Sequence, residues 1–320
     1  RVRQLEKQLG ERHSFDKIIG TSKPILKAIE LAQKVAPTET TVLLTGETGT
    51  GKEVFAQAIH QASACNNQNF VAINCSAFSR ELLENELFGH KAGAFTGATR
   101  DQKGLFEEAH KGTIFLDEIG EMAIELQAKI LRVLETGEFL RVGDTKPIKV
   151  KVRIIAATNR NLAEEITKEH FRSDLFYRLS VFTIELPALR DRNKDIQLLA
   201  KFYVASFALK SNRKPLVLTE EYLRALENNE WKGNIRELKN VIERSVILAN
   251  NDQLDLDTLP QEIQYGKSSS KTLSAFSMAS IEKLHIQKVL NHTDGNKAET
   301  ARLLEIGVAT LYRKIVEYKL

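Results

Sequence analysis

The chain has 320 residues, of which 42% are hydrophobic and 28% are charged, and its formal net charge is +4. This length predicts two or three domains rather than one, and the ordinary composition gives no reason to expect long disorder. The mild charge excludes binding to nucleic acid through net charge alone, so such a site must come from a local cluster of residues.

Two features bear on the cellular compartment. Cys65 and Cys75 show neither metal-ligand spacing nor a disulfide framework, so both are interpreted as buried structural residues in a reducing cytosol. No apolar run approaches the ~18 residues that a transmembrane helix needs, and the chain does not open with a signal-peptide pattern. The sequence therefore predicts a cytoplasmic protein without a membrane partner.

The first residues have the spacing of a short coiled coil. Val2, Leu5 and Leu9 recur at intervals of three and four, and the chain begins with Arg1 instead of methionine. We therefore expect residues 1–15 to be a linker helix that follows an N-terminal regulatory domain outside this sequence.

Short β-rich runs alternate with helical patterns in the next part of the chain. The runs cover residues 41–45, 70–74, 113–116, 152–158 and 182–186. This alternation predicts an α/β domain with a mostly parallel sheet, which we place at residues 16–187.

After Pro187 the predicted strands stop and only helical patterns remain. These patterns cover residues 195–210, 220–229 and 235–250, and they predict a helical subdomain over residues 188–265. Residues 266–280 are rich in Ser and Lys and have no apolar period, so we expect a flexible linker there. A last helical module is expected at residues 281–320.

A glycine-rich segment follows the first predicted strand and precedes a helical pattern over residues 53–60. Its sequence, Gly-Glu-Thr-Gly-Thr-Gly-Lys at residues 46–52, is a P-loop motif in the strand-to-helix context that the motif requires. Backbone N–H groups of such a loop surround a polyphosphate, and Lys52 reaches the β- and γ-phosphates. An ordinary glycine-rich turn is the alternative, and seven matching positions argue against it. The predicted ATP-binding residues here are Gly46, Glu47, Thr48, Gly49, Thr50, Gly51, Lys52 and Glu53.

The predicted magnesium site depends on two carboxylates and on one departure from the P-loop motif. The third predicted strand ends in Asp117 and Glu118, the Walker B pattern, so Asp117 is predicted to hold Mg²⁺ and Glu118 to polarise the attacking water. Adjacent carboxylates alone are more often a solvated turn, but the upstream P-loop favours hydrolysis. Glu53 stands where the motif has Ser or Thr, so Thr50 or water remain as alternatives for the hydroxyl ligand.

Residues 93–98 read Gly-Ala-Phe-Thr-Gly-Ala, and alone they could be an ordinary surface turn. Between two Walker motifs, this segment resembles the signature loop of the sigma-54-dependent activators, the NtrC-like bacterial enhancer-binding proteins. The resemblance covers residues 15–262 as an AAA+ P-loop NTPase with a helical lid, and residues 281–320 as a small all-α, Fis-like helix-turn-helix domain. It implies that the residues that contact sigma-54 are Gly93, Ala94, Phe95, Thr96, Gly97 and Ala98.

The resemblance also implies catalytic roles for residues outside the two Walker motifs. Asn74 resembles the switch asparagine that holds Glu118 away from water until sigma-54 is contacted. Arg172 and Arg178 resemble arginine fingers that act on the nucleotide of a neighbouring subunit, where such a residue accelerates phosphoryl transfer by about 10³–10⁵-fold. A surface ion pair is the alternative for either arginine when it is taken alone.

Further nucleotide contacts are implied in the same way. Thr158 and Asn159 at a strand end resemble the sensor of the γ-phosphate, and Ile19 lies in a segment that packs on the adenine. Arg236 resembles the second sensor, which reaches the nucleotide from the lid. From the residues alone, Asn234 is predicted to be the N-cap of the helix that carries Arg236.

The C-terminal residues have helix-turn-helix character. Residues 297–304 are predicted to form a helix, 305–307 a turn and 308–318 a second helix. The second helix carries a predicted buried stripe of Val308, Leu311, Tyr312 and Ile315. The residues predicted to face the DNA major groove are Ala309, Thr310, Arg313 and Lys314. A structural three-helix bundle is the alternative.

Taken together, the resemblance implies a ring-forming ATPase, with a hexamer expected, that requires ATP and Mg²⁺. It implies binding to enhancer DNA and remodelling of the closed complex of sigma-54 RNA polymerase holoenzyme, in a response regulator of a two-component system. The alternatives are a DNA-binding regulator with a vestigial AAA+ domain and an AAA+ remodeller of another protein. Glu118, Arg172 and Phe95 with Thr96 argue against the first, and the loop argues against the second.

Overall fold

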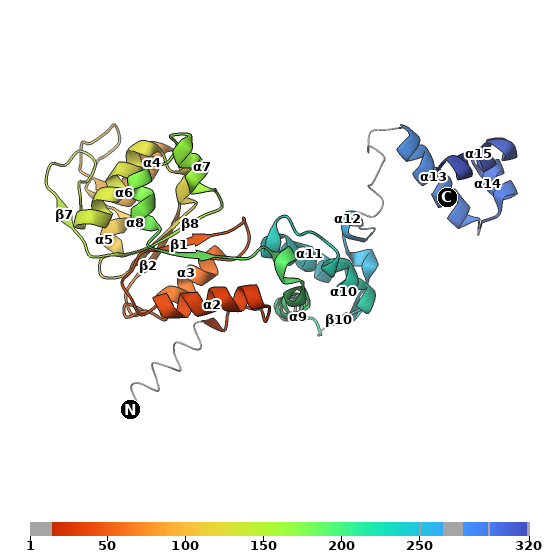
Figure 1. Cartoon of the computed structure of the whole chain (residues 1–320), viewed down its shortest axis with the longest axis horizontal. Helices are drawn as coiled ribbons and strands as arrows, with labels where there is room; N and C mark the ends of the chain where they lie inside the picture. The colour runs from red at the N-terminus through yellow and green to blue at the C-terminus, as the bar shows by residue number, and fades with distance from the viewer. Residues whose placement is uncertain (1–14, 215, 250, 265–277, 294, 319–320) are drawn as a thin grey trace, which may run out of the picture. The chain divides into compact units, whose positions relative to one another are not determined.

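The computed structural model describes residues 15–214, 216–249, 251–264, 278–293 and 295–318 (Figure 1). The chain forms two compact units, Arg1–Pro260 and Gln261–Leu320. The linker helix expected at residues 1–15 and most of the linker expected at 266–280 lie outside the described residues. Among the described helices, none has the length and apolar character needed to span a membrane.

A parallel five-stranded sheet forms the centre of the first unit, in the order β2-β5-β8-β1-β9. The strands are β1 (Val42–Thr45), β2 (Phe70–Asn74), β5 (Thr113–Asp117), β8 (Arg153–Thr158) and β9 (Phe182–Glu185). All five predicted strands are present with ends shifted by at most one residue, and the predicted parallel α/β fold is confirmed. Thr45 of β1 lies opposite Thr158 of β8, and Asn74 of β2 lies opposite Asp117 of β5. The predicted site residues at these strand ends therefore lie together at the carboxyl edge of the sheet.

Helices cover both faces of this sheet (Figure 1). The helices α2 (Lys23–Val35) and α3 (Lys52–Gln61) pack on one face through a core that includes Ile25 and Phe55. The opposite core is larger and includes Phe88, Phe106 and Ile130. The elements on this side are α4 (Arg80–Phe88), α5 (Leu105–Glu108), α6 (Ile124–Thr136), α7 (Leu162–Thr167) and α8 (Ser173–Leu179). The central strands β1, β5 and β8 are therefore buried on both faces, which explains their mostly apolar sequences, whereas the edge strands β2 and β9 keep exposed residues.

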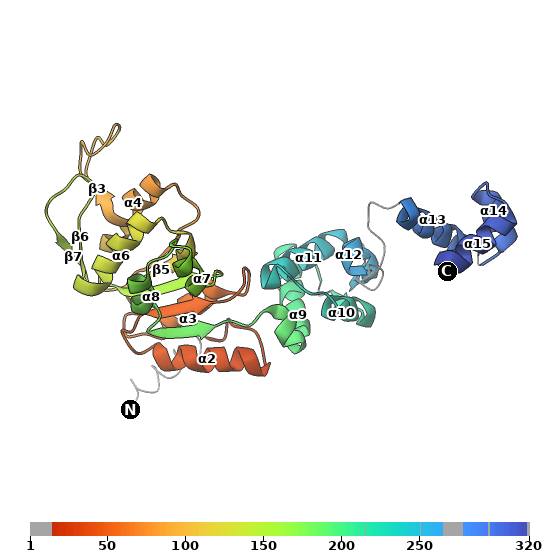
Figure 2. The same cartoon turned by 45° about the horizontal axis from the view of Figure 1, so that its top comes forward.

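Two short hairpins and a 3₁₀ turn extend the domain beyond the sheet. Strand β3 (Gly89–His90) pairs antiparallel with β4 (Gln102–Lys103), and β6 (Glu138–Phe139) pairs with β7 (Ile148–Lys149). The turn η1 (Ile119–Glu121) follows β5 directly. The segment between β3 and β4 projects away from the α/β layers (Figure 2).

The rest of the first unit is mostly helical. It contains η2 (Leu189–Arg192), α9 (Asn193–Lys210), α10 (Glu220–Glu227), α11 (Asn234–Leu248) and η3 (Leu256–Thr258). The expectation that strands stop after Pro187 is wrong in one detail, because β10 (Val217–Leu218) pairs in parallel with β11 (Gln253–Leu254). Two residues per strand are too few to give an alternating sequence pattern.

The second unit contains α12 (Gln261–Gln264), α13 (Met278–His292), α14 (Lys297–Leu303) and α15 (Val308–Tyr318). Its core is formed by Ile286, Ala301, Leu311 and Tyr318. The buried stripe predicted for α15 is therefore partly wrong, because Val308 and Tyr312 are 46% and 49% exposed. The buried side follows Leu311, Ile315 and Tyr318 at i, i+4 and i+7, and Tyr312 instead lies under the Lys297 ammonium, 4.8 Å from its ring centre.

Candidate active site

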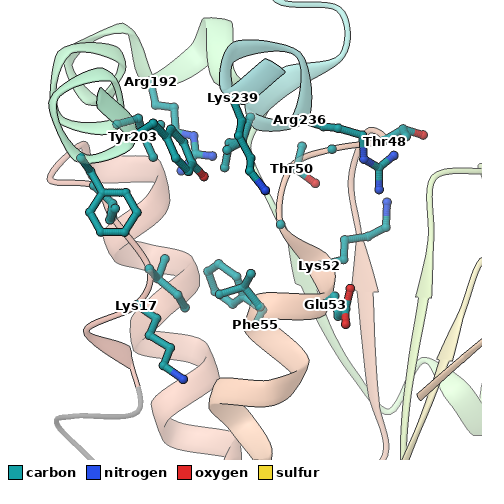
Figure 3. Close-up of a pocket in the computed structure, with 18 of the residues that line it drawn as sticks. Lys17, Thr48, Thr50, Lys52, Glu53, Phe55, Arg192, Tyr203, Arg236 and Lys239 are labelled. Atoms are coloured by element: carbon teal, nitrogen blue, oxygen red, sulfur yellow. The ribbon is translucent and has the colours of Figure 1, made fainter. Parts of the chain in front are cut away.

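A pocket of about 340 Å³ opens between the phosphate loop and the helical lid (Figure 3). The α/β domain lines it with residues 48–55, with Ile19, and with Asp117 and Glu118. The lid lines it with residues of α9 and with Ile235, Arg236 and Lys239 of α11. The structure therefore brings the predicted P-loop, Walker B and lid residues together around one cavity.

The phosphate loop ends where α3 begins, at Lys52. Lys52 is 6% exposed, and its Nζ donates to the carbonyls of Gly46 (2.9 Å) and Glu47 (3.3 Å). Burial lowers the pKa of Lys52, the carboxylates of Glu118 and Asp117 oppose that shift, and Arg236 adds to it. This ammonium and the N-terminus of α3 together provide a site for a polyphosphate.

Gly49 is required where the lid meets the loop. It has φ +80°, and a Cβ at this position would lie 2.3 Å from the Gly233 carbonyl and 3.1 Å from the Cβ of Arg236. The backbone N–H of Ile235 donates to the Gly49 carbonyl at 3.0 Å. The lid helix therefore starts in direct contact with the phosphate loop, and Figure 3 shows Arg236 beside Thr48.

The structure corrects the N-cap role predicted for Asn234 and shows the surroundings of the Glu47 side chain. Asn234 is not an N-cap: it is the first residue of α11, with its side chain fully buried. Its Oδ1 accepts from Leu189 N (2.7 Å), and its Nδ2 donates to Thr48 O (3.0 Å) and to Glu47 Oε2 (3.1 Å). The Glu47 carboxylate also accepts from both Arg190 Nη groups, and hydrogen bonds from Arg190 and then Asn234 lower its pKa. Glu47 thus faces the lid rather than the pocket.

The Walker B carboxylates end β5 beside the loop. Glu118 has φ +53°, a left-handed conformation that costs free energy in a residue with a Cβ. Its N–H donates to Asp117 Oδ1 (3.0 Å), and its Oε2 accepts from Asn159 N (3.4 Å). The contact expected between Asn74 and Glu118 is replaced by another, because Asn74 Oδ1 accepts from Ser76 N and Ser76 Oγ.

The two predicted sensor residues, Thr158 at the end of β8 and Asn159 directly after it, make different contacts. Asn159 Nδ2 donates to Thr48 Oγ1 at 2.9 Å, so Asn159 links the loop to Glu118. Thr158 is fully buried, and its Oγ1 accepts from Arg160 N. Only Asn159 is placed to respond to the loop.

The residues present fit a magnesium ion held mainly by phosphates and water. Asp117 supplies a carboxylate beside Lys52, and the described residues contain no cluster of three His, Cys, Asp or Glu side chains that could hold a metal alone. Mg²⁺ commonly binds through one or two carboxylates together with substrate phosphates. Thr50 is 2% exposed and donates to Glu47 O, and Glu53 accepts from Gln57, so water remains the better substitute for the missing hydroxyl.

Residues that the sequence analysis missed line the far side of the pocket. Arg192 is 2% exposed, and its Nε and Nη2 have no hydrogen-bond partner in the described structure. Tyr203 lies next to it, and Lys17 and Lys239 line the same cavity (Figure 3). Buried guanidinium donors without partners are costly, so this side of the pocket is suited to a polar ligand group. No motif marked these positions, because Lys17 lies in a turn, Arg192 in η2, and Tyr203 and Lys239 on two different lid helices.

The two predicted arginine fingers lie outside this pocket. Arg172 pairs with Asp174 (2.7 Å) and Arg178 with Glu135 (3.4 Å), and both side chains are exposed. Asp174 raises the pKa of Arg172. Neither arginine lines the pocket of its own chain, and both are presented to the outside of the α/β domain.

Loop 93–98 is a compact turn between β3 and β4 in which Gly93, Phe95, Thr96 and Gly97 are exposed, Ala94 is partly buried and Ala98 is buried. Gly93 N donates to Ala98 O (2.8 Å), which closes the turn, and the Phe95 ring packs on His90 with centroids 5.0 Å apart. Phe95 is still 46% exposed, and Thr96 at the tip is exposed. None of the loop residues lines the pocket, so this segment is separate from the phosphate site.

In the second unit, three of the four predicted DNA-facing residues are exposed on α15: Ala309, Thr310 and Arg313. Lys314 differs, because its Nζ donates to Glu282 Oε2 (2.9 Å) and to the Tyr318 hydroxyl (3.1 Å). These hydrogen bonds raise its pKa. The Lys314 side chain therefore links α15 to α13 within the second unit.

Comparisons with known proteins give a consistent assignment for each part. Residues 18–185 match the sigma-54 interaction domain, 190–276 the AAA+ ATPase lid domain, and 277–318 the bacterial regulatory protein, Fis family. The nitrogen fixation protein AnfA of Azotobacter vinelandii is 44% identical over 313 residues, which cover 96% of this chain and 58% of AnfA. The regulatory protein AtoC of Escherichia coli (strain K12) is 40% identical over 326 residues, covering 99% of this chain and 71% of AtoC.

Solved structures agree with this assignment. The crystal structure of NtrX from Brucella abortus in complex with ATP is similar with a TM-score of 0.72 and 34% identity, covering all of this chain and 72% of NtrX. The chain spans about 58% of the length of AnfA. Because the sigma-54 interaction domain alone matches more than half of the chain and is followed by the lid and Fis-family domains, the chain belongs to the sigma-54-dependent transcriptional activators.

Proposed function

We propose that this chain hydrolyses ATP and uses the free energy to convert the closed complex of sigma-54 RNA polymerase into an open complex at promoters. The observation that carries the proposal is the pocket itself: Lys52, the Walker B carboxylates and the lid residue Arg236 surround one cavity. Phe95 and Thr96 of loop 93–98 are exposed elsewhere on the same domain. A promoter-opening assay with purified sigma-54 holoenzyme tests it. Opening is expected only with hydrolysable ATP, and equal opening with a non-hydrolysable analogue would contradict it.

In this proposal, the residues around the pocket have separate roles in ATP hydrolysis. Lys52 binds the β- and γ-phosphates, and Arg236 approaches them from the lid. Glu118 is the base that orients the attacking water, and Asn159 holds it through its backbone N–H. Mg²⁺ held by Asp117 would neutralise charge on the phosphates. The unpartnered donors of Arg192, together with Ile19, fit the nucleoside end of ATP.

A ring of subunits completes the site in this proposal. The side chains of Arg172 and Arg178 are exposed and pair with the neighbouring carboxylates of Asp174 and Glu135, so exchange of these exposed ion pairs would let them reach a nucleotide held by an adjacent copy. A positioned arginine stabilises the charge of the transferring phosphoryl group. We therefore expect hydrolysis to depend on assembly, with a hexamer as the expected ring.

The remaining parts of the proposal concern regulation and DNA. We assign residues 16–187 and 188–265 to the AAA+ module, 266–280 to a linker, and 281–320 to binding of enhancer DNA through α15. A segment at residues 1–15 would connect the module to a regulatory domain, in the manner of a two-component response regulator. Since RNA polymerase acts in the cytoplasm, the protein would act there. The family assignment argues against both a vestigial ATPase and a remodeller of unrelated proteins.

Replacing Glu118 with glutamine should separate nucleotide binding from hydrolysis. The amide keeps the shape of the side chain but cannot polarise water, so kcat should fall by about 10²–10⁴-fold. The Kd for ATP should stay within about threefold, since Lys52 and the lid contacts are unchanged. Steady-state ATPase assays and fluorescent-nucleotide titration measure the two quantities. Glu121→Gln, one turn further along, is the matched control, and a similar loss in that variant would count against the role of Glu118.

Arg313 and Lys314 should behave differently although they are adjacent. Arg313 is exposed, so Arg313→Ala should weaken binding to a duplex selected from a random pool by about 1–3 kcal/mol. Lys314 is held by Glu282 and Tyr318, so Lys314→Ala should mainly lower the melting temperature of the second unit. Gel shifts and thermal melts on the same preparations distinguish these effects. Equal loss of DNA affinity with unchanged melting in both variants would contradict the assignment.

A further inference from the structure

A second cavity of about 520 Å³ lies at the opposite edge of the sheet from the nucleotide pocket. It is lined at the start of β8 by Arg153, and the start of β5, Thr113, lies beside Arg153 in register. Cys65 lines the same cavity and is half-buried, which corrects the expectation that both cysteines are buried. The cavity therefore places a thiol beside a buried guanidinium, away from the site described above.

Arg153 carries a buried charge that forms no ion pair with a carboxylate among the described residues. It is 6% exposed, and its Nη1 and Nη2 donate to the carbonyls of Ala36 (2.6 Å) and Val35 (2.9 Å) at the end of α2. Its Nε has no hydrogen-bond partner, and the described residues offer it no ion pair. Burial lowers the pKa of Arg153, and Cys65 is the strongest influence in the opposite direction, followed by Glu39. An anion at Cys65 would therefore compensate this charge.

Two hydroxyl groups lie within hydrogen-bonding distance of the Cys65 sulfur atom. Cys65 Sγ lies 3.1 Å from Ser63 Oγ and 3.4 Å from Thr113 Oγ1. Thr113 Oγ1 is in turn 2.9 Å from Nδ1 of His60, which is buried. A thiolate at Cys65 can accept a hydrogen bond from Thr113 without any change of backbone. Partly exposed thiols in electropositive surroundings are the ones that react in proteins.

The mouth of this cavity is cationic. Lys111 and Lys151 both line it and are exposed, and the backbone N–H of Lys111 donates to the Lys151 carbonyl. Glu39 is the one carboxylate that lines the cavity in the described structure, and it is paired with Lys151 at 2.6 Å. Together with Arg153, which lines the same cavity, the two lysines favour a ligand that carries carboxylate groups.

We propose that Cys65 is a site of covalent modification by low-molecular-weight disulfides that carry carboxylates, of the glutathione disulfide class. The Cys65 thiolate attacks one sulfur of the disulfide, so a new S–S bond forms at Cys65 while the original S–S bond breaks. The electron pair leaves with the released thiolate, which takes up the proton that Cys65 lost. Cys65 is oxidised to the disulfide level, and half of the reagent is reduced to a thiol.

The same chain contains an internal control thiol. Cys75 is only 3% exposed, so its thiol is shielded from a reagent in solution. Cys75 should therefore stay unmodified under conditions that modify Cys65. Folded chain incubated with glutathione disulfide at neutral pH should gain a single glutathionyl group. Peptide mapping by mass spectrometry should place it on Cys65, and a thiol reductant should remove it.

Charge variants test the ligand class separately from the reactivity of the thiol. Lys111→Asn suits the left-handed backbone of Lys111 (φ +67°), and Lys151→Gln removes the second charge. Each should slow modification by glutathione disulfide by about two- to fivefold, and neither should change the rate with uncharged 2-hydroxyethyl disulfide. Cys65→Ser should abolish the adduct. The proposal is overturned if Cys75 reacts first, if folded chain gives no adduct at Cys65, or if both reagents slow equally in the lysine variants.

Discussion

Replacing Lys52 with alanine is expected to lower ATP hydrolysis by about 10²–10³-fold, the usual cost of removing one positioned donor from a charge-stabilising site. Lys52 is buried in the loop, with Asp117 and Glu118 near enough to raise its pKa against the effect of burial. Its removal leaves those two carboxylates without their nearest cation in the loop, so a polyanionic ligand should be repelled. The measurement is a steady-state ATPase assay over a range of ATP concentrations.

A matched lysine distinguishes this local effect from a general loss of charge. Lys34 is exposed on α2 and pairs with Glu30, so Lys34→Ala should leave turnover unchanged. In Lys52→Ala, nucleotide titration should show weakened ATP binding, in contrast to Glu118→Gln. If Lys52→Ala kept normal turnover, the loop would be an ordinary glycine-rich turn and the assignment of the pocket would be wrong.

The architecture of the first unit could be predicted from sequence because its signals are local. The three central strands β1, β5 and β8 are buried and mostly apolar, and the segments between strands have helical patterns, so five strands and a mostly parallel sheet followed from alternation. The phosphate loop was predicted for the same reason, since its residues are consecutive. The ends of β5 and β8 then placed Asp117 and Asn159 beside it.

The interactions between the lid and the loop could not be predicted, because their partners are far apart in sequence. Asn234 and Glu47 are separated by 187 positions, and a cap was the obvious local role for an asparagine before a helix. Arg192 was missed in the same way, since its importance comes from burial beside the pocket rather than from a motif. The rotation of the buried face of α15 depends on packing against other helices of its unit, which a single-helix pattern does not specify.

Thr96 is the most informative residue for the coupling between ATP hydrolysis and sigma-54 binding, because it lies in a loop outside the nucleotide pocket. Loop 93–98 is closed by its own hydrogen bonds, contributes nothing to the pocket, and presents Thr96 to solvent. If nucleotide state shifts the loop between positions, sigma-54 can favour one position only through a difference in affinity. A change confined to the tip should therefore alter that affinity and leave the chemistry of the pocket intact.

Thr96→Ala should thus bind and hydrolyse ATP at near-normal rates and form rings, while its affinity for sigma-54 with ADP and aluminium fluoride falls at least about tenfold, or ~1.4 kcal/mol. Promoter opening should be lost together with this affinity. Gel shifts of sigma-54 and ATPase assays on the same samples measure both effects. Thr99→Ala, also exposed and three residues further on, is the control and should retain sigma-54. Full sigma-54 binding and promoter opening in Thr96→Ala would show that the loop is only a surface turn, because the pocket would then act on the polymerase through some other part of the domain.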